Sequence, residues 1–578
     1  INQINIKTYQ YVEKMEGMPE DVELNRMRKW LKQHQIKAVP YDKGVGFALM
    51  SEEAYEEKIN HILNGEQFER KKLRSNSRPI ELVEQDRINK ILDNLNKKGK
   101  ISDAMLDDLK IRGGQIPKIY GLAKVHKDGV PVRPIVSMSG TVYRKVGELV
   151  SEWLSRLPES KINCGSKTVT DMFRKGRHSM KIRPNRKLVS FDVVSLYTNV
   201  PVKEAINLAA EKLYELEDVP PVDKETFIIL ANLCCSDVLL RSNNGVYIQK
   251  DGLAMGIQPA PLLANIWLSQ FDDIIKGDGE IYFRYMDDAL NDVLEGQEIE
   301  KLNEINALHP KLKFTLEVQK NDDEKEDEVG RIAFLDMEII QKKDGSLESE
   351  WFTKPTDTGI IMNWYAIAPM RYKKNIVSGF VNRIWNATSS YDAFVRGCEK
   401  AKIILTNNQY PKNWVEWEVG KATLKVYDKR SNPVDGFDRG GKKLVPMAEN
   451  DTEARVKKLI FLQYRGIETE RLAEKLVEIG CMIKPVFTLR KMKTITPTLK
   501  PRTDLCNQSN LIYQYECASC SGAYVGYTTR HLGVRVEEHH TRKTSSIWKH
   551  HQECEGTFDR DAFTCLYKTN KGRVFWKQ

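Results

Sequence analysis

The chain has 578 residues, which is enough for several domains because a single domain usually holds roughly 100–200 residues. It carries 90 Lys and Arg against 80 Asp and Glu, and this balance of +10 favours a polyanionic partner. No apolar run is long enough to cross a bilayer and the first ten residues do not resemble a signal peptide, so neither membrane insertion nor secretion is expected. Since the chain begins at Ile1 and not at Met, we expect that the protein extends further upstream.

Helices are predicted for most of the first hundred residues. Residues 20–35 follow Pro19 and have a polar helical periodicity, whereas residues 46–50 are a candidate strand after a turn. From about residue 117 onward, short apolar runs broken by Gly and Pro indicate strands mixed with helices. The body of the chain is therefore expected to be α+β.

A stretch rich in Gly, Pro and Asn at 431–450 indicates a domain boundary, and two helices are predicted after it, over 452–464 and 468–479. Cysteine and histidine are concentrated further on, since six of the ten cysteines follow residue 480 and five of the ten histidines follow residue 530. In a chain without a secretion signal, such clustering favours a metal site over disulfides.

Two adjacent acids, Asp287 and Asp288, end the segment YMDD (285–288) between two short apolar runs. This pattern predicts a strand, a turn and a second strand, with both carboxylates at the turn. Adjacent carboxylates repel each other, so such a pair usually holds a cation. A second predicted strand, 188–191, ends at Asp192. If Asp192 lies beside Asp287, these acids can hold two Mg²⁺ ions about 3.5–4 Å apart, which would activate a primer 3′-hydroxyl and stabilise the leaving pyrophosphate.

Several segments, in this order, resemble the fingers and palm of reverse transcriptases over about residues 115–355. The resemblance implies a polymerase that copies RNA into DNA with Asp192, Asp287 and Asp288 as catalytic Mg²⁺ ligands. The segments are KIYGLAKVHK (118–127) and RPIV (133–136) in the fingers, SFDVVSLY (190–197) and YMDD (285–288) as the catalytic segments, GLAMG (252–256) through Asn265 as the template-positioning segment, and FLD (334–336) as the primer grip.

The same resemblance implies contacts to the incoming nucleotide. Lys118, Lys124 and Arg133 correspond to fingers cations that hold the triphosphate. Tyr197 corresponds to the aromatic ring that excludes a ribose 2′-hydroxyl, so dNTPs are the expected substrates; a core aromatic is the alternative interpretation. Gln258 is a candidate contact to the template or the incoming base, although its segment IQPA differs from the SPLS that is usual among the closest relatives.

A basic run precedes the catalytic strand. Residues 174–187 hold seven Lys or Arg and no acid, which suits a surface that follows nucleic-acid phosphates. A lone charge run of this kind is more often a solvated face.

Beyond residue 500 the sequence resembles the GIY-YIG nuclease family. LIY (511–513) and YVG (524–526) correspond to its two short motifs, with Leu511 replacing the first Gly and Val525 replacing Ile, and Arg535 is expected on the helix that follows. In this family two tyrosines and an arginine surround the scissile phosphate. The resemblance implies catalytic roles for Tyr513, Tyr524 and Arg535.

The tail also holds candidate metal ligands. The nuclease family binds its divalent metal through a glutamate on a later helix, and we expect that either the chain continues beyond Gln578 or the nuclease lacks this carboxylate. Cys517 and Cys520 in a hairpin turn, with His539 and His550 downstream, predict a structural Zn²⁺ site. Alternatives for the last positions are Cys506, His551 and Cys554.

A palm followed by this nuclease, with paired Cys between the two nuclease motifs, is the combination found in Penelope-like retroelements. DKG (42–44), KPT (354–356) and YRG (464–466) strengthen a resemblance that covers nearly the whole chain. It implies a nuclear enzyme that nicks DNA and copies the RNA of its element into the chromosome by target-primed reverse transcription. The implied partners are template RNA, target DNA with a primer 3′-hydroxyl, and dNTPs, with no membrane; self-association stays open.

The expected fold is multidomain α+β, a right-hand polymerase with fingers, palm and helical thumb, followed by a helical linker and a small α/β GIY-YIG nuclease domain. The expected ranges are 1–110 for an N-terminal helical region, 111–354 for fingers and palm, 355–430 for the thumb, 431–500 for the linker and 501–578 for the nuclease.

Two other functions stay open. A telomerase-like reverse transcriptase with an inactive nuclease tail would extend single-stranded ends without any cut. A domesticated nucleic-acid-binding protein would have no catalysis, and it is disfavoured because Asp192, Asp287, Asp288 and Tyr197 are all present.

Overall fold

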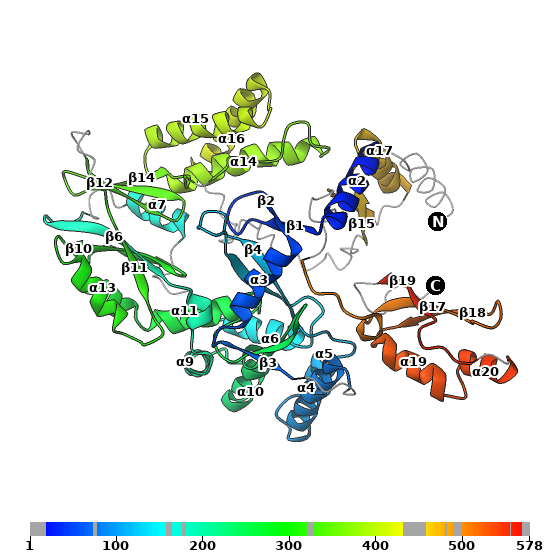
Figure 1. Cartoon of the computed structure of the whole chain (residues 1–578). Helices are drawn as coiled ribbons and strands as arrows, with labels where there is room; N and C mark the ends of the chain where they lie inside the picture. Colours follow the sequence, from blue (N-terminus) through cyan, green and yellow to red (C-terminus); the bar gives the residue numbers. More distant parts are fainter. Residues whose placement is uncertain are drawn as a thin grey trace, which may run out of the picture.

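Six sheets and the helices around them make up the described part of the protein, as a computed structural model shows (Figure 1). No helix in this part combines enough length with enough hydropathy to form a membrane span. The structure describes residues 19–72, 78–157, 165–175, 181–320, 328–355, 357–431, 458–479, 483–489, 499–554 and 557–568.

The N-terminal region adds a strand to the fingers sheet. Helices were predicted for most of this region, but it also contains three short strands. The expected helix over 20–35 and the expected strand at 46–50 are both present. The other two strands, β1 and β3, were missed because they are short and because β3 pairs with a segment far along the chain, so no local pattern marks it. The elements are α2 (Pro19–Gln33), β1 (Ile36–Pro40), β2 (Phe47–Ser51), α3 (Glu52–Leu63), β3 (Phe68–Lys71), α4 (Ile80–Lys97) and α5 (Asp103–Leu109).

The fingers sheet has five strands in the order β3-β8-β7-β4-β5. Within it β4 pairs with β5 in antiparallel register, so that Leu122 lies opposite Arg133. The other members are β4 (Lys118–Ala123), β5 (Val132–Ser137), β7 (Val238–Ser242) and β8 (Gly245–Gln249).

The palm sheet is antiparallel, in the order β11-β6-β10-β9. Its central strand β6 alternates between two hydrophobic cores, since Val189 and Phe191 belong to one core and Leu188 belongs to the other. Burial on both faces holds this strand in one register. The strands are β6 (Arg186–Val193), β9 (Tyr282–Tyr285), β10 (Asp288–Leu294) and β11 (Phe314–Val318), and the neighbouring helices are α6 (Arg144–Leu154), α7 (Ser166–Lys175), α8 (Leu196–Asn199), α9 (Val202–Tyr214), α10 (Lys224–Cys235), α11 (Ala260–Ser269), α12 (Asp272–Lys276) and α13 (Glu298–Asn306).

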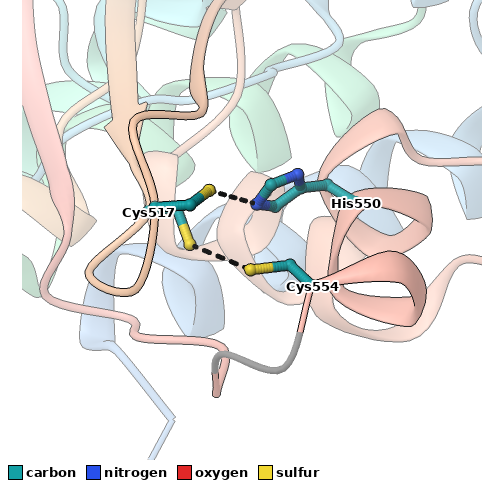
Figure 2. Close-up of side chains that lie close together, drawn as sticks. Cys517, His550 and Cys554 are labelled. Carbon is teal, nitrogen blue, oxygen red and sulfur yellow. Dashed lines mark hydrogen bonds between the residues drawn. The ribbon is translucent and has the colours of Figure 1, made fainter.

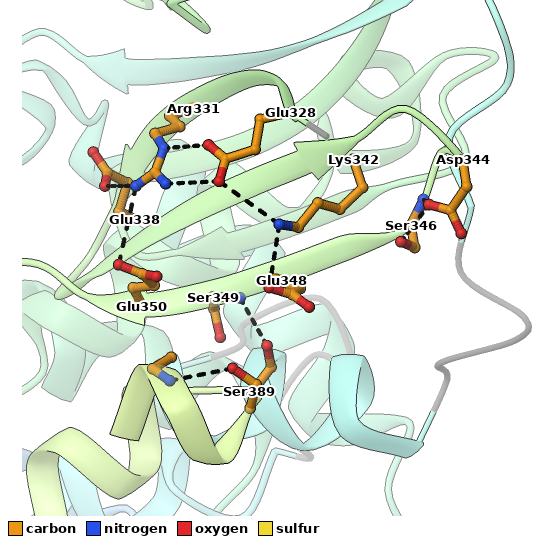
Figure 3. A network of polar contacts seen from close by, with 12 residues as sticks. Glu328, Arg331, Glu338, Lys342, Asp344, Ser346, Glu348, Ser349, Glu350 and Ser389 are labelled. Carbon is orange, nitrogen blue, oxygen red and sulfur yellow. Dashed lines mark hydrogen bonds and ion pairs between the residues drawn. The ribbon is translucent and has the colours of Figure 1, made fainter. Parts of the chain in front are cut away.

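A three-stranded sheet joins the palm to the helices of the expected thumb (Figure 1). Salt bridges cover its surface, with Arg331 between Glu328 and Glu338 (Figure 3). The sheet is fastened to the turn between two thumb helices, because Ser349 N–H donates to Ser389 Oγ at 2.8 Å and Ser389 N–H donates back to Ser349 O at 3.0 Å. The elements are β12 (Glu328–Phe334), β13 (Met337–Lys342), β14 (Leu347–Trp351), α14 (Met370–Ala387), α15 (Tyr391–Asn407) and α16 (Lys412–Ser431).

The linker contains two parallel strands around one helix, and this corrects the prediction of an all-helical linker. Strand β15 (Lys458–Gln463) replaces the end of the helix predicted over 452–464, whereas α17 (Ile467–Ile479) confirms the second predicted helix. The partner of β15 is β16 (Ile483–Thr488). The apolar run in β15 is too short for its periodicity to distinguish a strand from a buried helix.

The tail forms a small α/β unit with the strand order β18-β17-β19. It packs against the fingers loop before β4, where His531 Nε2 lies 3.0 Å from Gly114 O and Ser509 Oγ donates to Gly113 O. Gly113 has a φ of +75°, and a Cβ on it would lie 2.4 Å from Thr529 O, so this contact requires glycine. The elements are η1 (Leu505–Asn507), β17 (Leu511–Glu516), β18 (Ala523–Thr528), α19 (Leu532–Thr541), α20 (Ser546–Glu553) and β19 (Phe563–Lys568).

Candidate active sites in the palm and the tail

The palm brings the three predicted aspartates together. Asp288, the first residue of β10, lies opposite Asp192, near the end of β6, in the antiparallel register. The turn between β9 and β10 has Met286 at a φ of +57°, and Val193 N–H donates to Asp287 O at 3.1 Å. The strand, turn and strand predicted around YMDD therefore exist, and all three carboxylates lie at one edge of the palm sheet.

These carboxylates repel one another in a partly buried environment. Burial raises the pKa of Asp288 to about 7, and the negative charges of Asp287 and Asp192 add to this shift. Burial and the Asp192 charge also raise the pKa of Asp287, although Arg133 and Lys43 act against this. Three hard oxygen ligands whose charges destabilise one another are a donor set that suits divalent cations such as Mg²⁺.

Tyr197 lies beside this cluster. It belongs to the short helix α8, which follows Ser195 at a φ of +52°, and its carbonyl accepts a hydrogen bond from Leu253 N–H at 2.6 Å. Burial raises the pKa of the half-buried Tyr197, and the charge of Asp287 adds to the shift. The ring therefore lies close enough to Asp287 to border a nucleotide held there.

The predicted triphosphate cations do not all lie at this site. Arg133 Nε is 3.0 Å from Asp42 Oδ1, and its charge acts on Asp287 and Tyr197. Lys124 follows β4 next to Arg133, where burial and the Arg133 charge lower its pKa. Lys118 is at the other end of β4, six residues or about 20 Å away along the strand. The structure therefore places Arg133 near the acids, with Lys124 beside Arg133, but Lys118 elsewhere.

The template-positioning segment packs tightly, and the Gln258 side chain is directed at Gly147 of α6. Gln258 Oε1 is buried without a hydrogen-bond partner, and a Cβ on Gly147 of α6 would lie 2.9 Å from it. A Cβ on Gly256, at a φ of +130°, would lie 2.0 Å from Val136 O, so only glycine allows the loop to approach β5.

The basic run at 174–187 does not present free cations over its described part. Its side chains from 174 to 180 lie outside the described residues. The other four cations pair with carboxylates: Lys181 with Asp344 at 3.4 Å, Arg183 with Glu280 at 2.6 Å, Arg186 with Asp278 at 2.9 Å and with Asp292 at 2.5 Å, and Lys187 with Glu295 at 2.6 Å.

Two functional candidates were missed from the sequence. Arg284 is fully buried in β9, where its Nε and Nη2 bind the two oxygens of Asp272 at 2.6 and 2.9 Å and its Nη1 donates to Asn265 Oδ1 at 2.6 Å and to Met286 O at 3.0 Å. It therefore holds the turn that carries Asp287. The sequence signal that could have identified Arg284 is that it is a charged residue within the apolar strand before YMDD. The second is Lys354, whose charge lowers the pKa of Asp288.

In the tail, the three predicted nuclease residues lie together. Arg535 Nε donates to Tyr513 OH at 3.1 Å, and the rings of Tyr513 and Tyr524 are 6.3 Å apart. Tyr513 OH also lies 2.7 Å from His539 Nε2, and His539 Nδ1 lies 2.7 Å from Ser545 Oγ. Burial lowers the pKa of His539 to about 4, and the Arg535 charge adds to this shift, so the ring is neutral at pH 7 and its Nε2 can accept a hydrogen bond from the Tyr513 hydroxyl.

Three arginines surround the one carboxylate beside these residues. Glu538 binds Arg530 through both oxygens at 2.6 and 2.9 Å, Arg535 at 3.1 Å and Arg542 at 3.0 Å. With its oxygens engaged in this way, Glu538 fixes Arg535 in place and is a poor metal ligand.

A cluster of three thiols and one imidazole lies at the hairpin turn of the tail (Figure 2). The ligand atoms of Cys517, Cys520, His550 and Cys554 all lie within 4.8 Å of one another, and this donor set suits Zn²⁺. A Cβ on Gly522 would come 2.9 Å from the His550 ring. The structure corrects the predicted ligand set at one position, because His539 contacts Tyr513 and Ser545 and Cys554 takes its place.

Comparison with known proteins finds two family matches within the body of the chain. Residues 125–321 match the family described as reverse transcriptase (RNA-dependent DNA polymerase), and residues 360–419 match the animal helix-turn-helix domain, which here covers α14, α15 and the start of α16. No curated protein sequence is similar enough to match.

Similar solved structures include two telomerases and a viral polymerase. Telomerase from Candida albicans in complex with a TWJ fragment of telomeric RNA is 12% identical over 70% of this chain and 70% of that chain, with a TM-score of 0.43. Apo telomerase from Candida tropicalis is 10% identical over 68% and 69%, with a TM-score of 0.38. The RNA-dependent RNA polymerase of a human picobirnavirus is 12% identical over 73% and 92%, with a TM-score of 0.35. On the family match, the chain contains a reverse transcriptase domain, and Asp192, Asp287 and Asp288 all lie inside it.

Proposed function

We propose that the protein is the reverse transcriptase of a Penelope-like retroelement, in which an RNA-directed DNA polymerase is joined to a DNA-nicking endonuclease that acts in the nucleus. The observation that carries this proposal is the register of β6 and β10, which places Asp192, Asp287 and Asp288 together inside a reverse transcriptase domain. The nick made by the tail would supply the primer 3′-hydroxyl that the palm extends.

In the palm, the residues of this chain orient the substrates. Arg133 and Lys124 would bind the triphosphate of the dNTP and draw its charge toward Asp287. The Tyr197 ring would leave no room for a ribose 2′-hydroxyl. Arg284 would hold the turn of Asp287 so that its carboxylate keeps one position during the reaction.

The three aspartates would hold Mg²⁺ at this edge of the sheet. When bound, Mg²⁺ would lower the pKa of the primer 3′-hydroxyl and neutralise charge on the phosphates. The carboxylates themselves must be ionised to bind it, so the raised pKa of Asp288 predicts weaker binding in mildly acidic solution.

In the tail, Tyr513 and His539 would orient the attacking water. The Tyr513 hydroxyl lies 2.7 Å from His539 Nε2, and this contact would hold the phenol oxygen so that it accepts a hydrogen bond from the water. Arg535, held by Glu538, would stabilise the negative charge that develops on the scissile phosphate. The divalent metal of the nuclease would need a carboxylate other than Glu538. A structural Zn²⁺ in the Cys517, Cys520, His550 and Cys554 cluster would hold the hairpin turn against α20.

Primer extension on an RNA template tests the polymerase. Wild-type protein should synthesise DNA, and Asp287→Ala should abolish synthesis; synthesis by this variant at the wild-type rate sinks the assignment. For the nuclease, Arg535→Ala should abolish nicking of a supercoiled plasmid while primer extension survives. Extension of single-stranded ends by a wild-type protein that does not nick would instead favour the telomerase-like alternative.

A further inference from the structure

A large cavity lies away from the acids, between the N-terminal region, β4 and the segment that enters the tail. Its volume is about 1150 Å³. This exceeds the roughly 300–1,000 Å³ that is typical of a small-molecule pocket. Residues of α2, β1, the start of α3, β4 and 499–502 line it, and those used below are Arg28, Lys32, Lys37, Tyr120, Lys500 and Arg502.

Positive charge dominates this cavity. Five Lys and Arg line it against two acids, Glu52 and Glu56. Both acids are already engaged by Lys37, at 3.1 and 2.6 Å. Among the side chains that the structure describes, no carboxylate lies within ion-pair distance of Lys32 or Arg502. The charges of Lys32 and Arg502 therefore favour an anionic ligand.

A crowded group of cations extends the cavity toward the tail. Lys118, at the start of β4, lies near Lys500, Lys568 and Arg241, of which Arg241 is paired with Glu81 at 2.5 Å. Burial lowers the pKa of Lys118 to about 8, and these three like charges add to the shift. Cations held this close to one another are stabilised when phosphates come between them.

The cavity also offers an aromatic ring. Lys500 Nζ lies 5.4 Å from the centre of the half-buried Tyr120 ring and donates to Ser137 Oγ at 2.8 Å. A ring surrounded by cations is the usual combination in sites for single-stranded nucleic acids, where bases stack and phosphates pair with Lys and Arg.

Strand β4 connects this cavity to the polymerase site. Lys118, Tyr120, Leu122 and Lys124 share one face of the strand, because alternate residues of a strand point the same way. Tyr120 and Leu122 line the cavity, whereas Lys124 lies beside Arg133 near the acids.

We propose that this cavity binds the phosphates and a base of the single-stranded RNA template before it reaches the copying position. The proposal rests on the proposed polymerase function, since it is the uncopied template that must run along β4 to the acids. Because Lys500 and Arg502 come from the segment that leads into the tail, bound template would contact the polymerase and the nuclease-bearing half of the chain at once.

Binding of a fluorescein-labelled single-stranded RNA to the full chain, followed by anisotropy over a series of salt concentrations, tests this inference. The triple variant K32Q/K500Q/R502Q is expected to lose about tenfold or more in RNA affinity, and the slope of log affinity against log salt should fall by about 2–3. In primer extension the KM for template should rise while kcat stays unchanged. The matched control is K203Q, an exposed lysine of α9 that does not line the cavity.

The binding readout separates this inference from the proposed function, because it needs no catalysis. Asp287→Ala should lose synthesis and keep RNA affinity. The milder variant K32Q, on an exposed face of α2, should show a smaller loss in the same direction. Unchanged RNA affinity and salt slope in the triple variant would overturn the proposal. The proposal would also be overturned if the triple variant lost affinity only for double-stranded DNA, because the cavity would then be a target-DNA site.

Discussion

Asp288 faces Asp192 across the pair of β10 and β6, and Asp287 precedes it in the turn. Such a close set of carboxylates would be unfavourable without a counter-charge, because the Asp192 charge raises the pKa of Asp287 and Asp288, and the Asp287 charge also raises that of Asp288. The nearest cations, Arg133, Lys43 and Lys354, act on the cluster but do not reverse the shift of Asp287 or Asp288. The palm edge is therefore less stable without a bound cation than with one.

The raised pKa of Asp288 predicts how stability changes with pH. An unfolded Asp has a pKa near 3.9, whereas the folded value is about 7. The folded state therefore holds a proton that the unfolded state releases, and the stability that this provides is present below about pH 4 and is lost as pH rises through 7. We expect metal-free protein to lose on the order of 1–3 kcal/mol from this group between pH 5 and pH 8.

Thermal unfolding with and without Mg²⁺ measures this effect. Mg²⁺ should raise the melting temperature at pH 8 and have little effect at pH 5. The variant Asp288→Asn should flatten the pH profile of the metal-free protein and remove most of the Mg²⁺ effect. Profiles of variant and wild type that coincide would show that Asp288 does not carry the dependence.

Removal of Arg284 should damage both stability and catalysis. Arg284→Met leaves Asp272 buried without its cation, which should cost about 3–5 kcal/mol in the free energy of unfolding. The double variant Arg284→Met/Asp272→Asn should recover much of this loss, because no unpaired charge remains. Its primer extension should stay low, since the hydrogen bond to Met286 O is absent. Urea denaturation and kcat measure the two effects, and a stable double variant with wild-type kcat would remove Arg284 from a positioning role.

The sequence was sufficient for the palm because its elements are local. The hairpin around YMDD and the strand that ends at Asp192 have clear apolar patterns, and their pairing is confirmed. Strand β3 and strand β15 were missed for a different reason, since each is a short run whose identity depends on a distant or later partner. A local pattern carries no information about such partners.

The site residues were predictable where a motif contains one residue of the required type. They were less predictable where several residues of that type could fill the same position. The three acids lie together in the palm as expected, and the two nuclease tyrosines lie together in the tail as expected. Lys118 was grouped with Lys124 because they share a segment, but six residues of extended chain separate them. His539 was chosen as a zinc ligand over Cys554 because spacing alone does not show which side of α19 faces the hairpin, and in the structure that side faces Tyr513.

Tyr197 should control the choice of sugar. Tyr197→Val opens space beside Asp287, so incorporation of ribonucleotides should increase, and the ratio of kcat/KM for dNTP over NTP should fall by about tenfold or more. The matched variant Tyr197→Phe keeps the ring and should keep the ratio. Single-nucleotide extension with each sugar gives the measurement, and equal discrimination by Val and Tyr would leave the ring with a packing role only.

His539 should make the tail sensitive to mild acid. Its folded pKa is about 4, whereas an unfolded His has a pKa near 6.5. The unfolded state therefore takes up a proton first, and stability is lost as pH falls from about 6.5 toward 4. His539→Gln should reduce this loss while it weakens nicking, because Gln lacks the ring whose two nitrogens contact Tyr513 OH and Ser545 Oγ and so fix the position of the phenol. Melting temperatures at pH 7 and pH 5 and a nicking assay check both results; an unchanged acid loss in the variant contradicts the assignment.

The composition of the thiol cluster predicts which substitutions release zinc. We expect one Zn²⁺ per chain in purified protein, and Cys554→Ser should lower this content and the melting temperature, because Cys554 Sγ lies 3.9 Å from Cys517 Sγ. Cys506→Ser is the matched control, since Cys506 lies outside the cluster. His539→Gln should keep its zinc, which separates the observed ligand set from the one expected from spacing. Elemental analysis of the four proteins decides the matter: zinc retained by Cys554→Ser and lost from His539→Gln would restore the set of Cys517, Cys520, His539 and His550.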